Sequence, residues 1–334
     1  MIRVSAGIIR RADGCILICR RGENRGNAGL WEFPGGKQES GESAAACLRR
    51  ELQEELSLPV TEPALLCTRE AQGIIFDFLT CETAAEPVLT EHASCAWVRP
   101  RAMLGYDFCP ADTGVARALA LQDPPLRHFM WDFDGTLMDT YPAMVAAFLA
   151  ACRRFGEEVD PAYALTLMKD NLTHCIRTVA DERGMDFDAL TAAYREEENA
   201  VPDDAVPPLP SIPEVLRALH AAGGRHYLVT HRDSRAWDFL RAAGLRELFE
   251  GGVVKEDRLP RKPEPDMVQA ILDRFGIDPA EAVMIGDRPL DTAAGRAAGV
   301  LSLMLDPDRR FPGDPAELRC ENAQELVPLL TGTL

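Results

Sequence analysis

Residues 128–139 read His-Phe-Met-Trp-Asp-Phe-Asp-Gly-Thr-Leu-Met-Asp, in which a short, mostly apolar run is followed by two aspartates with one residue between them. The apolar run 128–131 predicts a strand that is covered on both faces, as in parallel sheets. Open α/β sheets bind their ligands at the carboxyl ends of the strands. Asp132 and Asp134 are therefore predicted to lie in a binding site, although an isolated pair of aspartates with this spacing is usually a surface turn.

Similar short apolar strands follow at 227–229, 253–254 and 283–285, with helical patterns between them. This alternation predicts an α/β, Rossmann-like fold with a parallel sheet. The segment between the first two strands is much longer than the crossover of about a dozen residues that parallel strands need. It predicts an inserted helical cap at about 141–206, and the proline-rich return 206–210 is expected to serve as a hinge strand.

Polar residues close these strands in an order that resembles the motifs of haloacid dehalogenase-type phosphatases. The segment 132–136, Asp-Phe-Asp-Gly-Thr, resembles the first motif, Thr230 the second, Lys262 the third, and the segment 286–291 the acidic fourth. Taken alone, Thr230 or Lys262 would be an ordinary polar residue. Four matches in the family's order identify the second part of the chain as a member of this superfamily, similar to its phosphoglycolate phosphatase-like branch with helical caps.

This resemblance implies a two-step mechanism in which Asp132 attacks phosphorus and forms an aspartyl phosphate. Asp134 would protonate the leaving oxygen and then deprotonate water, acting first as general acid and then as general base. Thr230 and Lys262 would hold the phosphoryl oxygens. The residues at 231–232, His-Arg, either contact the substrate or merely line the loop. The implied ligands of Mg²⁺ or Mn²⁺ are Asp132, the main-chain carbonyl of Asp134, Asp287 and Asp291, and the implied substrate-binding residues are Gly135 and Thr136.

The first third of the chain has a different pattern. Two apolar, β-branched stretches flank the turn 11–14 and predict a hairpin. Helical patterns at 43–56 and 112–121 combine with these strands to predict an α+β domain. Successive prolines after residue 122 stop the last helix, so the predicted domains are 1–122 and 127–334, with a linker at 123–126. Further short strands are expected at 64–69, 73–80 and 96–99.

Three glutamates, Glu51, Glu54 and Glu55, stand at positions i, i+3 and i+4 of the predicted helix 43–56. This spacing places their carboxylates on one helical face, with Cβ atoms roughly 5 to 6 Å apart. Like charges so close repel unless a cation lies among them, and hard divalent ions prefer such oxygen ligands. The alternative is a solvated acidic face that pairs with Arg49 and Arg50.

The residues around these glutamates resemble the Nudix box along its full length, with Gly36, Glu42 and Arg50 at the family's spacing. One position departs from the family: Ser57 stands where glycine is usual at the helix end, so a strained C-cap is expected. The resemblance implies that Glu42 and Arg50 brace the helix and orient Glu51. The general base is left open. The implied ligands of Mg²⁺ or Mn²⁺ are Glu51, Glu54 and Glu55.

Within the Nudix superfamily, the first domain is similar to the nucleoside-triphosphate branch, which includes 8-oxo-dGTP diphosphatase and CTP pyrophosphohydrolase. Asp112 falls where these enzymes place a residue against the base, and its alternative role is the N-cap of the last helix. Some relatives have a further glutamate near the final strand. In this chain Glu91 is somewhat distant from that position, and Ala96 occupies the nearer one. The implied substrate-binding residues are Arg20, Arg21, Gly36, Lys37 and Asp112.

The formal net charge of −17 disfavours binding to DNA or RNA, which needs clustered Lys and Arg. Small phosphorylated substrates, above all nucleotides, remain compatible with this charge because divalent cations neutralise both partners. No apolar run approaches the roughly 20 residues of a membrane-spanning helix. The ten scattered cysteines and the absence of a signal-like start predict a cytoplasmic protein with reduced thiols, with Cys15 and Cys19 in the core. The oligomeric state is left open.

These observations together predict a bifunctional hydrolase. The first domain is expected to cleave a (d)NTP or a related nucleoside diphosphate derivative to (d)NMP and pyrophosphate. The second is expected to dephosphorylate a small phosphomonoester, and the nucleotide product of the first reaction is one candidate. Two alternatives remain: a Nudix domain that senses a ligand and regulates the phosphatase, and a Nudix domain that acts on nucleotide sugars such as ADP-ribose.

Overall fold

The computed structural model describes residues 2–23, 26–90 and 92–332. The chain divides into two compact units, one of Met1–Pro125 together with Pro328–Leu334 and one of Leu126–Val327. The grouping of the last residues with the first unit has no counterpart in the domains predicted from the sequence, whose bounds remain predictions.

A mixed β-sheet forms the centre of the first unit. Its strands are β1 (Ile2–Arg10), β2 (Ile16–Arg20), β3 (Trp31–Glu32), β4 (Gly35–Lys37), β5 (Ala64–Ala71), β6 (Ile74–Glu82) and β7 (Ser94–Val98). The strand order is β3-β2-β1-β6-β5, while β4 pairs with β1 and β7 pairs with β2. The turn 11–14 joins β1 and β2 as an antiparallel hairpin, which confirms the prediction from its sequence. β1 and β6 run parallel, so the sheet is mixed.

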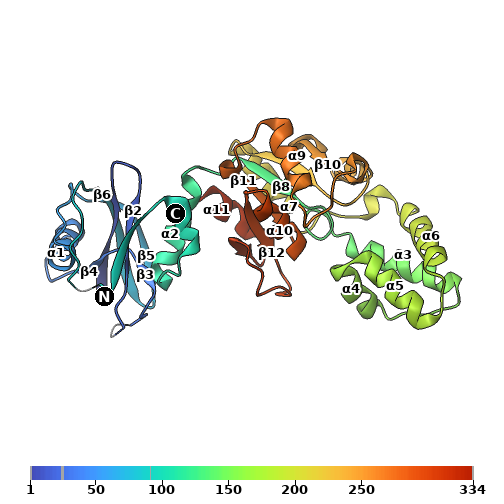
Figure 1. Cartoon of the computed structure of the whole chain (residues 1–334), viewed down its shortest axis with the longest axis horizontal. Helices are drawn as coiled ribbons and strands as arrows, with labels where there is room; N and C mark the ends of the chain where they lie inside the picture. Colours follow the sequence, from blue (N-terminus) through green and yellow to red (C-terminus); the bar gives the residue numbers. More distant parts are fainter. Residues whose placement is uncertain (1, 24–25, 91, 333–334) are drawn as a thin grey trace. The chain divides into compact units, whose positions relative to one another are not determined.

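Helices α1 (Ala44–Leu56) and α2 (Pro110–Gln122) cover opposite faces of this sheet (Figure 1). Alternating side chains of β1 serve the two faces: Ile8 packs in the core beneath α2, and Ile9 packs in the core beneath α1. Cys19 is also buried beneath α1, Cys15 is buried, and the ten cysteines are free thiols, as predicted. The predicted α+β fold of the first part is confirmed.

The two ends of α1 differ in how well their residues suit them. At the start, the Ser43 side chain accepts a hydrogen bond of 3.2 Å from the Ala46 N–H and caps the helix. At the end, Ser57 adopts the left-handed conformation, with φ 48° and ψ 37°. Its N–H donates to the Gln53 carbonyl at 3.2 Å. Glycine adopts this conformation without a steric penalty, whereas serine adopts it at a cost in free energy, so the C-cap carries the expected strain.

A six-stranded parallel sheet forms the centre of the second unit, in the order β10-β9-β8-β11-β12-β13. Its strands are β8 (His128–Trp131), β9 (Arg225–Val229), β10 (Phe249–Val253), β11 (Ala282–Gly286), β12 (Leu301–Leu305) and β13 (Leu318–Cys320). Helices between and after them are α7 (Ile212–Ala221), α8 (Ala236–Ala242), α9 (Asp266–Phe275), α10 (Pro289–Ala297) and α11 (Leu326–Thr331). Strand and helix alternate as the sequence predicts, which confirms the α/β fold.

A helical cap is inserted between β8 and β9 (Figure 1). It consists of α3 (Tyr141–Arg154), α4 (Pro161–Asp170), α5 (Leu172–Arg183) and α6 (Phe187–Asn199). These helices enclose a core of their own, in which the rings of Phe148 and Tyr194 are buried with centroids 6.4 Å apart. The cap therefore has its own packing and does not depend on the sheet for a hydrophobic core.

The cap is joined to the sheet domain by two segments that lie side by side. The Asp139 N–H donates to the Pro207 carbonyl at 2.9 Å, and the Leu209 N–H donates to the Leu137 carbonyl at 3.0 Å. Met138 and Pro208 form the antiparallel bridge between these bonds. The proline-rich return 206–210 thus pairs with the outgoing segment through a single β-bridge and does not form a regular strand, and its role as a hinge stays a prediction. Among the described residues, no helix is long and apolar enough to cross a membrane.

Candidate active sites

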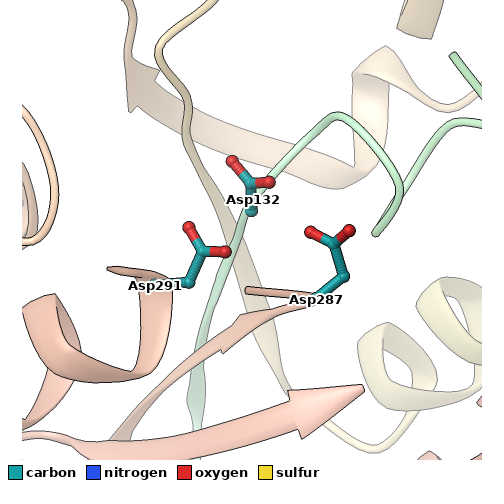
Figure 2. Close-up of side chains that lie close together, drawn as sticks. All are labelled: Asp132, Asp287 and Asp291. Carbon is teal, nitrogen blue, oxygen red and sulfur yellow. The ribbon is translucent and has the colours of Figure 1, made fainter. Parts of the chain in front are cut away.

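Three carboxylates converge at the carboxyl ends of the central strands of the second unit. Asp132 follows β8, Asp287 follows β11, and Asp291 lies in the first turn of α10. Each offers an oxygen within 4.8 Å of the others (Figure 2). The side chains of Asp132 and Asp291 are almost completely buried. The predicted motif residues at these strand ends therefore share one site.

Lys262 is the buried cation of this site. Its Nζ lies 2.6 Å from Asp132 Oδ1 and 2.6 Å from Asp291 Oδ1, and it donates to the Val229 carbonyl at 2.8 Å. Burial alone would lower the pKa of Lys262, but the two aspartates raise it above its ordinary value. The lysine is therefore held as an ammonium ion against one oxygen of Asp132.

The second oxygen of Asp132 is in a different environment. Oδ2 is buried and accepts no hydrogen bond within the described chain, and Arg288 Nη2 lies 3.8 Å from it. One oxygen is thus anchored by Lys262 while the other keeps its lone pairs free. This is the arrangement that a carboxylate nucleophile needs.

The aspartate cluster has the properties of a divalent-cation site. Burial, followed by the charges of neighbouring carboxylates, raises the pKa of both Asp287 and Asp291. Tyr141 donates to Asp287 Oδ2 at 3.2 Å, and Thr136 donates to Asp287 Oδ1 at 3.4 Å, which fixes the direction of that side chain. Converging carboxylate oxygens that repel one another are the donor set preferred by Mg²⁺ and Mn²⁺.

Gly135 and Arg288 complete the surroundings of Asp287. Gly135 has φ 76°, and a Cβ there would collide with Asp287 and with the Tyr141 ring, so this position requires glycine. The Arg288 Nε lies 3.8 Å from Asp287 Oδ1. Arg288 and Tyr141 were not predicted from the sequence. The position of Arg288 inside the acidic motif was the available signal for it, whereas Tyr141 reaches the site only through the path of the chain into the cap.

A cavity of about 810 Å³ opens beside the aspartates. Gly135, Asp287 and Arg288 line it together with Leu165 of the cap and Phe311. Two ion pairs bridge the cap and the sheet domain around it: Lys169 pairs with Asp308, and Arg310 pairs with Asp170 at 3.2 Å. The cavity is therefore lined by cap residues such as Leu165 and by Asp287 and Arg288 of the aspartate site, while Asp132 and Asp291 are not among its lining residues.

In the first unit, the glutamates of α1 line a cleft of about 550 Å³. Predicted residues Glu51, Glu54, Glu55, Arg21, Gly36, Lys37 and Asp112 all line this cleft. Arg20 is not among its lining residues, and its Nε donates to the Gly29 carbonyl at 2.9 Å. The cleft thus brings together every implied ligand and substrate-binding residue of the Nudix domain except Arg20.

Arg50 braces the loop and helix that carry these glutamates. It donates to both oxygens of Glu42 at 3.0 Å and to Glu51 Oε1 at 2.8 Å. Hydrogen bonds from Arg50 and from the Glu39 N–H lower the pKa of Glu42 to about 2. A Cβ at Gly36 would collide with the carboxyl group of Glu51. These contacts agree with the bracing role that the family resemblance implies for Glu42 and Arg50.

The Nudix glutamates do not converge as the aspartates do. Across residues 2–23, 26–90 and 92–332, the group Asp132, Asp287 and Asp291 is the one whose oxygens gather closely enough to hold a metal unaided. Glu54 is exposed and lies 3.2 Å from Arg50, while Glu55 is buried. The alternative prediction was a solvated acidic face on which Arg49 and Arg50 pair with these glutamates. Arg50 does pair with them, but Arg49 pairs with Glu62. All three glutamates still present oxygen ligands to one cleft.

Asp112 also lines the cleft. Helix α2 begins at Pro110 with Cys109 as its N-cap, so the alternative role of Asp112 as the N-cap is wrong. Instead, the Phe33 N–H donates to Asp112 Oδ1 at 3.1 Å. Burial raises the pKa of Asp112 to about 7, which makes its protonated form accessible near neutral pH.

Two further residues of this site had no signal in the sequence. Glu32 on β3 forms an ion pair with Arg21, and His92 Nε2 lies 3.4 Å from Glu32 Oε1 and 3.8 Å from Glu55 Oε2. Of the candidates for an additional glutamate, Glu91 lies outside the described residues. Ala96, the other candidate position, pairs with Ile18 within the sheet.

Comparison with known proteins finds one hydrolase family for each of two parts of the chain. The family description "NUDIX domain" matches residues 1–118, and "Haloacid dehalogenase-like hydrolase" matches residues 129–305. The CTP pyrophosphohydrolase of Escherichia coli is 37% identical over 123 residues, which cover 35% of this chain and 90% of that protein. The phosphoglycolate phosphatase of Nitrosospira multiformis is 32% identical over 221 residues, which cover 62% and 93%.

A third relative, the pyrophosphatase PpaX of Halalkalibacterium halodurans, is 27% identical over 178 residues, which cover 53% of this chain and 81% of that protein. The NUDIX match includes the helix with the three glutamates, and the haloacid dehalogenase-like match includes the aspartate cluster at the strand ends. The chain therefore belongs to two hydrolase families at once, with a Nudix domain followed by a haloacid dehalogenase-like phosphatase domain.

Proposed function

We propose that the Nudix domain hydrolyses a nucleoside triphosphate to a nucleoside monophosphate and pyrophosphate. The similarity to the Escherichia coli CTP pyrophosphohydrolase and the cleft shared by Glu51, Glu54, Glu55 and Asp112 support this assignment. Glu51, Glu54 and Glu55 would hold Mg²⁺ or Mn²⁺, which neutralises phosphate charge and lowers the pKa of bound water. Arg50 keeps Glu51 directed into the cleft, and Asp112 offers a hydrogen-bonding group to the base.

The haloacid dehalogenase-like domain is proposed to cleave a phosphomonoester in two steps. Asp132 Oδ2 attacks phosphorus, the bond to the leaving oxygen breaks, and Asp134 gives that oxygen its proton. Asp134 then takes a proton from water, the water oxygen attacks phosphorus, and the bond to Asp132 breaks. Asp132, Asp287, Asp291 and the Asp134 carbonyl would hold Mg²⁺, which offsets the charge of phosphate and carboxylates.

One observation carries this mechanism. Asp132 has one oxygen held by Lys262 at 2.6 Å and the other buried without a hydrogen bond. A buried carboxylate oxygen without a donor is costly unless function requires it. Lys262 restrains the orientation of the nucleophile, and Thr230, buried at the end of β9, would bind a phosphoryl oxygen.

We further propose that the two reactions are consecutive, with the nucleoside monophosphate passing from the first reaction to the second. The chemical link is that the product of the Nudix reaction is itself a phosphomonoester. The cavity beside the aspartates, about 810 Å³, is in the range of pockets that enclose ligands the size of a nucleotide. A leaving group as small as glycolate would leave most of it unfilled.

Inorganic pyrophosphate is a second candidate substrate of the phosphatase domain. It is favoured by the similarity to the pyrophosphatase PpaX and by its release in the proposed Nudix reaction. The two candidates make different demands on the cavity. Nucleoside monophosphates would also contact lining residues such as Leu165 and Phe311, whereas pyrophosphate would contact only Asp287, Arg288 and their neighbours.

A substrate screen with separate detection of pyrophosphate and phosphate tests these proposals. Wild type, Glu55→Gln and Asp132→Asn would each be given nucleoside triphosphates, monophosphates, pyrophosphate and ADP-ribose. Glu55→Gln should lose cleavage of triphosphates and keep the phosphatase activity, while Asp132→Asn should do the reverse. Loss of both activities in one variant would contradict separate sites.

The same screen decides between the alternatives. A phosphatase that ignores every nucleoside monophosphate and cleaves pyrophosphate efficiently would replace the first candidate by the second. Preferred cleavage of ADP-ribose would move the Nudix domain to nucleotide sugars. A Nudix domain without turnover, whose ligands change the rate of the phosphatase, would identify it as a sensing module.

A further inference from the structure

Arg232 is a buried arginine that the proposed mechanism does not use. It lies two residues beyond Thr230, and its side chain is 10% exposed. The guanidinium carbon is 5.7 Å from the centroid of the Phe133 ring and 5.7 Å from that of Phe239. Packing against two aromatic rings restricts the plane of the guanidinium and so fixes the directions in which it donates.

Arg232 directs two of its donors at a single oxygen of Asp134. Nε donates to Asp134 Oδ1 at 3.0 Å, and Nη2 donates to the same oxygen at 2.8 Å. The Arg232 backbone N–H also donates to Thr230 Oγ1, at 3.0 Å. The other oxygen of Asp134, Oδ2, takes no part in this fork. One residue therefore orients the carboxyl of Asp134 and also contacts the threonine at the end of β9.

The third arm of Arg232 reaches the cap. Nη1 donates to Glu198 Oε1 at 3.1 Å, and Glu198 belongs to the last cap helix, α6. The guanidinium is thus shared between a carboxylate of the sheet domain and a carboxylate of the cap. If α6 moved away from the sheet domain, Glu198 would leave Arg232. The guanidinium that donates to Asp134 would then no longer be held from the cap side.

We propose that Arg232 is a positioning residue that turns Oδ2 of Asp134 toward the leaving oxygen when the cap is in place. Because both donors occupy Oδ1, Oδ2 is left as the oxygen that carries and delivers the proton. Arginine is not itself a proton donor in this range, so it acts only by orientation. The inference rests on the proposed acid role of Asp134. It links cap closure to the proton-transfer step.

Arg235 provides a matched control in the same loop. Its guanidinium carbon also lies over the Phe239 ring, at 4.8 Å, and its Nε donates to Asp203 Oδ1 at 3.0 Å. It also donates to the Glu198 carbonyl at 2.9 Å. Arg235 therefore anchors the returning chain of the cap, while the hydrogen bonds to Asp134 come from Arg232. Arg235→Met removes this anchor of the returning chain but leaves the hydrogen bonds of Arg232 to Asp134 and to the Glu198 side chain in place.

The test compares two phosphate esters that differ in their need for an acid. Para-nitrophenyl phosphate has a leaving group that departs without protonation, whereas glycerol phosphate releases an alkoxide that needs a proton. The ratio kcat/KM reports the steps up to transfer of the phosphoryl group to Asp132, so the later attack by water does not enter. Full-length wild type, Asp134→Asn, Arg232→Met, Arg232→Lys, Glu198→Gln and Arg235→Met would be compared in Mg²⁺.

Arg232→Met should lose on the order of 10²-fold in kcat/KM with glycerol phosphate, the lower end of the range for general acid catalysis, and far less with para-nitrophenyl phosphate. Arg232→Lys should recover part of the loss, and Glu198→Gln should shift the ratio between the two esters in the same direction. Arg235→Met should change both esters by the same factor. Equal losses with both esters in Arg232→Met and Glu198→Gln would overturn the inference, because they indicate a structural role only.

Asp134→Asn separates this inference from the proposed mechanism. If Asp134→Asn discriminates between the esters and neither Arg232→Met nor Glu198→Gln does, the acid role stands and the positioning role fails. If Asp134→Asn shows no discrimination, the acid role itself fails, and the positioning role fails with it. Glu198→Gln keeps the test decisive if Arg232→Met does not fold, since it leaves the packing between the aromatic rings intact.

Discussion

Asp112 makes the stability of the Nudix domain depend on pH. Burial raises its pKa from the ordinary 3.8 to about 7, so the folded state binds a proton that the unfolded state releases. The stabilisation that this proton gives to the folded state is complete below pH 3.8 and is lost as the pH rises through about 7. The shift corresponds to at most roughly 4 kcal/mol between those limits, an upper bound at 1.36 kcal/mol per pKa unit.

The Asp112→Asn variant should therefore gain stability relative to wild type as the pH rises from 5 to 8. Asparagine accepts the Phe33 N–H through its amide oxygen and carries no charge to desolvate. Calorimetric unfolding in the presence of a chelator, at several pH values, measures the difference. A wild-type curve parallel to that of Asp112→Asn would show that this carboxyl does not titrate in the folded state between these limits.

Ser57 is a second residue whose replacement should stabilise the protein, because its backbone strain can be removed. It holds the left-handed conformation at the end of α1, with φ 48°, where glycine avoids the clash of Cβ with the backbone. We expect Ser57→Gly to stabilise the first unit by about 1 kcal/mol. Denaturant unfolding measures this gain. Ser57→Ala is the control and should give no gain, because alanine keeps the Cβ.

At the scale of elements, like charges lie close together at the ends of β8 and β11 and at the start of α10. The fold alone does not balance them. Without divalent metal, Asp287→Asn should raise the melting temperature of the second unit, because it removes one charge from the buried cluster. Mg²⁺ should raise the melting temperature of wild type, with a gain of about 2.7 kcal/mol at a hundredfold excess over Kd.

Thermal scans with chelator and with Mg²⁺ measure both effects. The Asp287→Asn variant should respond to Mg²⁺ much less than wild type. A variant less stable than wild type in chelator would show that the aspartate is needed for packing and that its charge is not the dominant effect. Asp314→Asn offers a comparison, since Asp314 accepts hydrogen bonds from Thr292 in the same helix region but lies outside the cluster.

Elements with a strong local pattern were predicted well. The hairpin around 11–14, the helix of the three glutamates and the parallel strands follow from periodicity and turn residues. The short helix α11 joins the first unit through its end, where the Gln122 side chain donates to the Gly332 carbonyl at 2.6 Å. Nothing in its local sequence could reveal which unit it would accompany.

The sites divide in the same way. Residues at the ends of predicted strands or on one helical face, such as Asp132 and Glu51, could be placed from their spacing together with the family resemblance of the surrounding motifs. Glu32, His92 and the contacts of Arg232 depend on distant segments that meet only in the folded chain. The N-cap role considered for Asp112 was wrong because Pro110 starts α2 earlier, which turns Asp112 into the cleft.

At the scale of the whole molecule, both domains are expected to depend on divalent metal although their donor sets differ. Chelation should abolish cleavage of nucleoside triphosphates and of phosphomonoesters, because both sites need charge neutralisation between carboxylates and phosphates. Titration with Mg²⁺ after chelation should restore the two activities with separate midpoints. An activity that survives exhaustive chelation would show that its site works without a dissociable metal.

The paired segments at the base of the cap have one more consequence. Both connections of the cap pass through a single short ribbon, in which Asp139 and Leu209 donate to Pro207 and Leu137. The cap encloses its own core, and the sheet beneath it has a separate one. The cap is thus a separately packed insert whose two connections to the sheet domain run side by side. A chain that kept this ribbon together with Tyr141 and Glu198 and exchanged the rest of the cap could adopt a new leaving-group specificity without altering the sheet that carries the nucleophile.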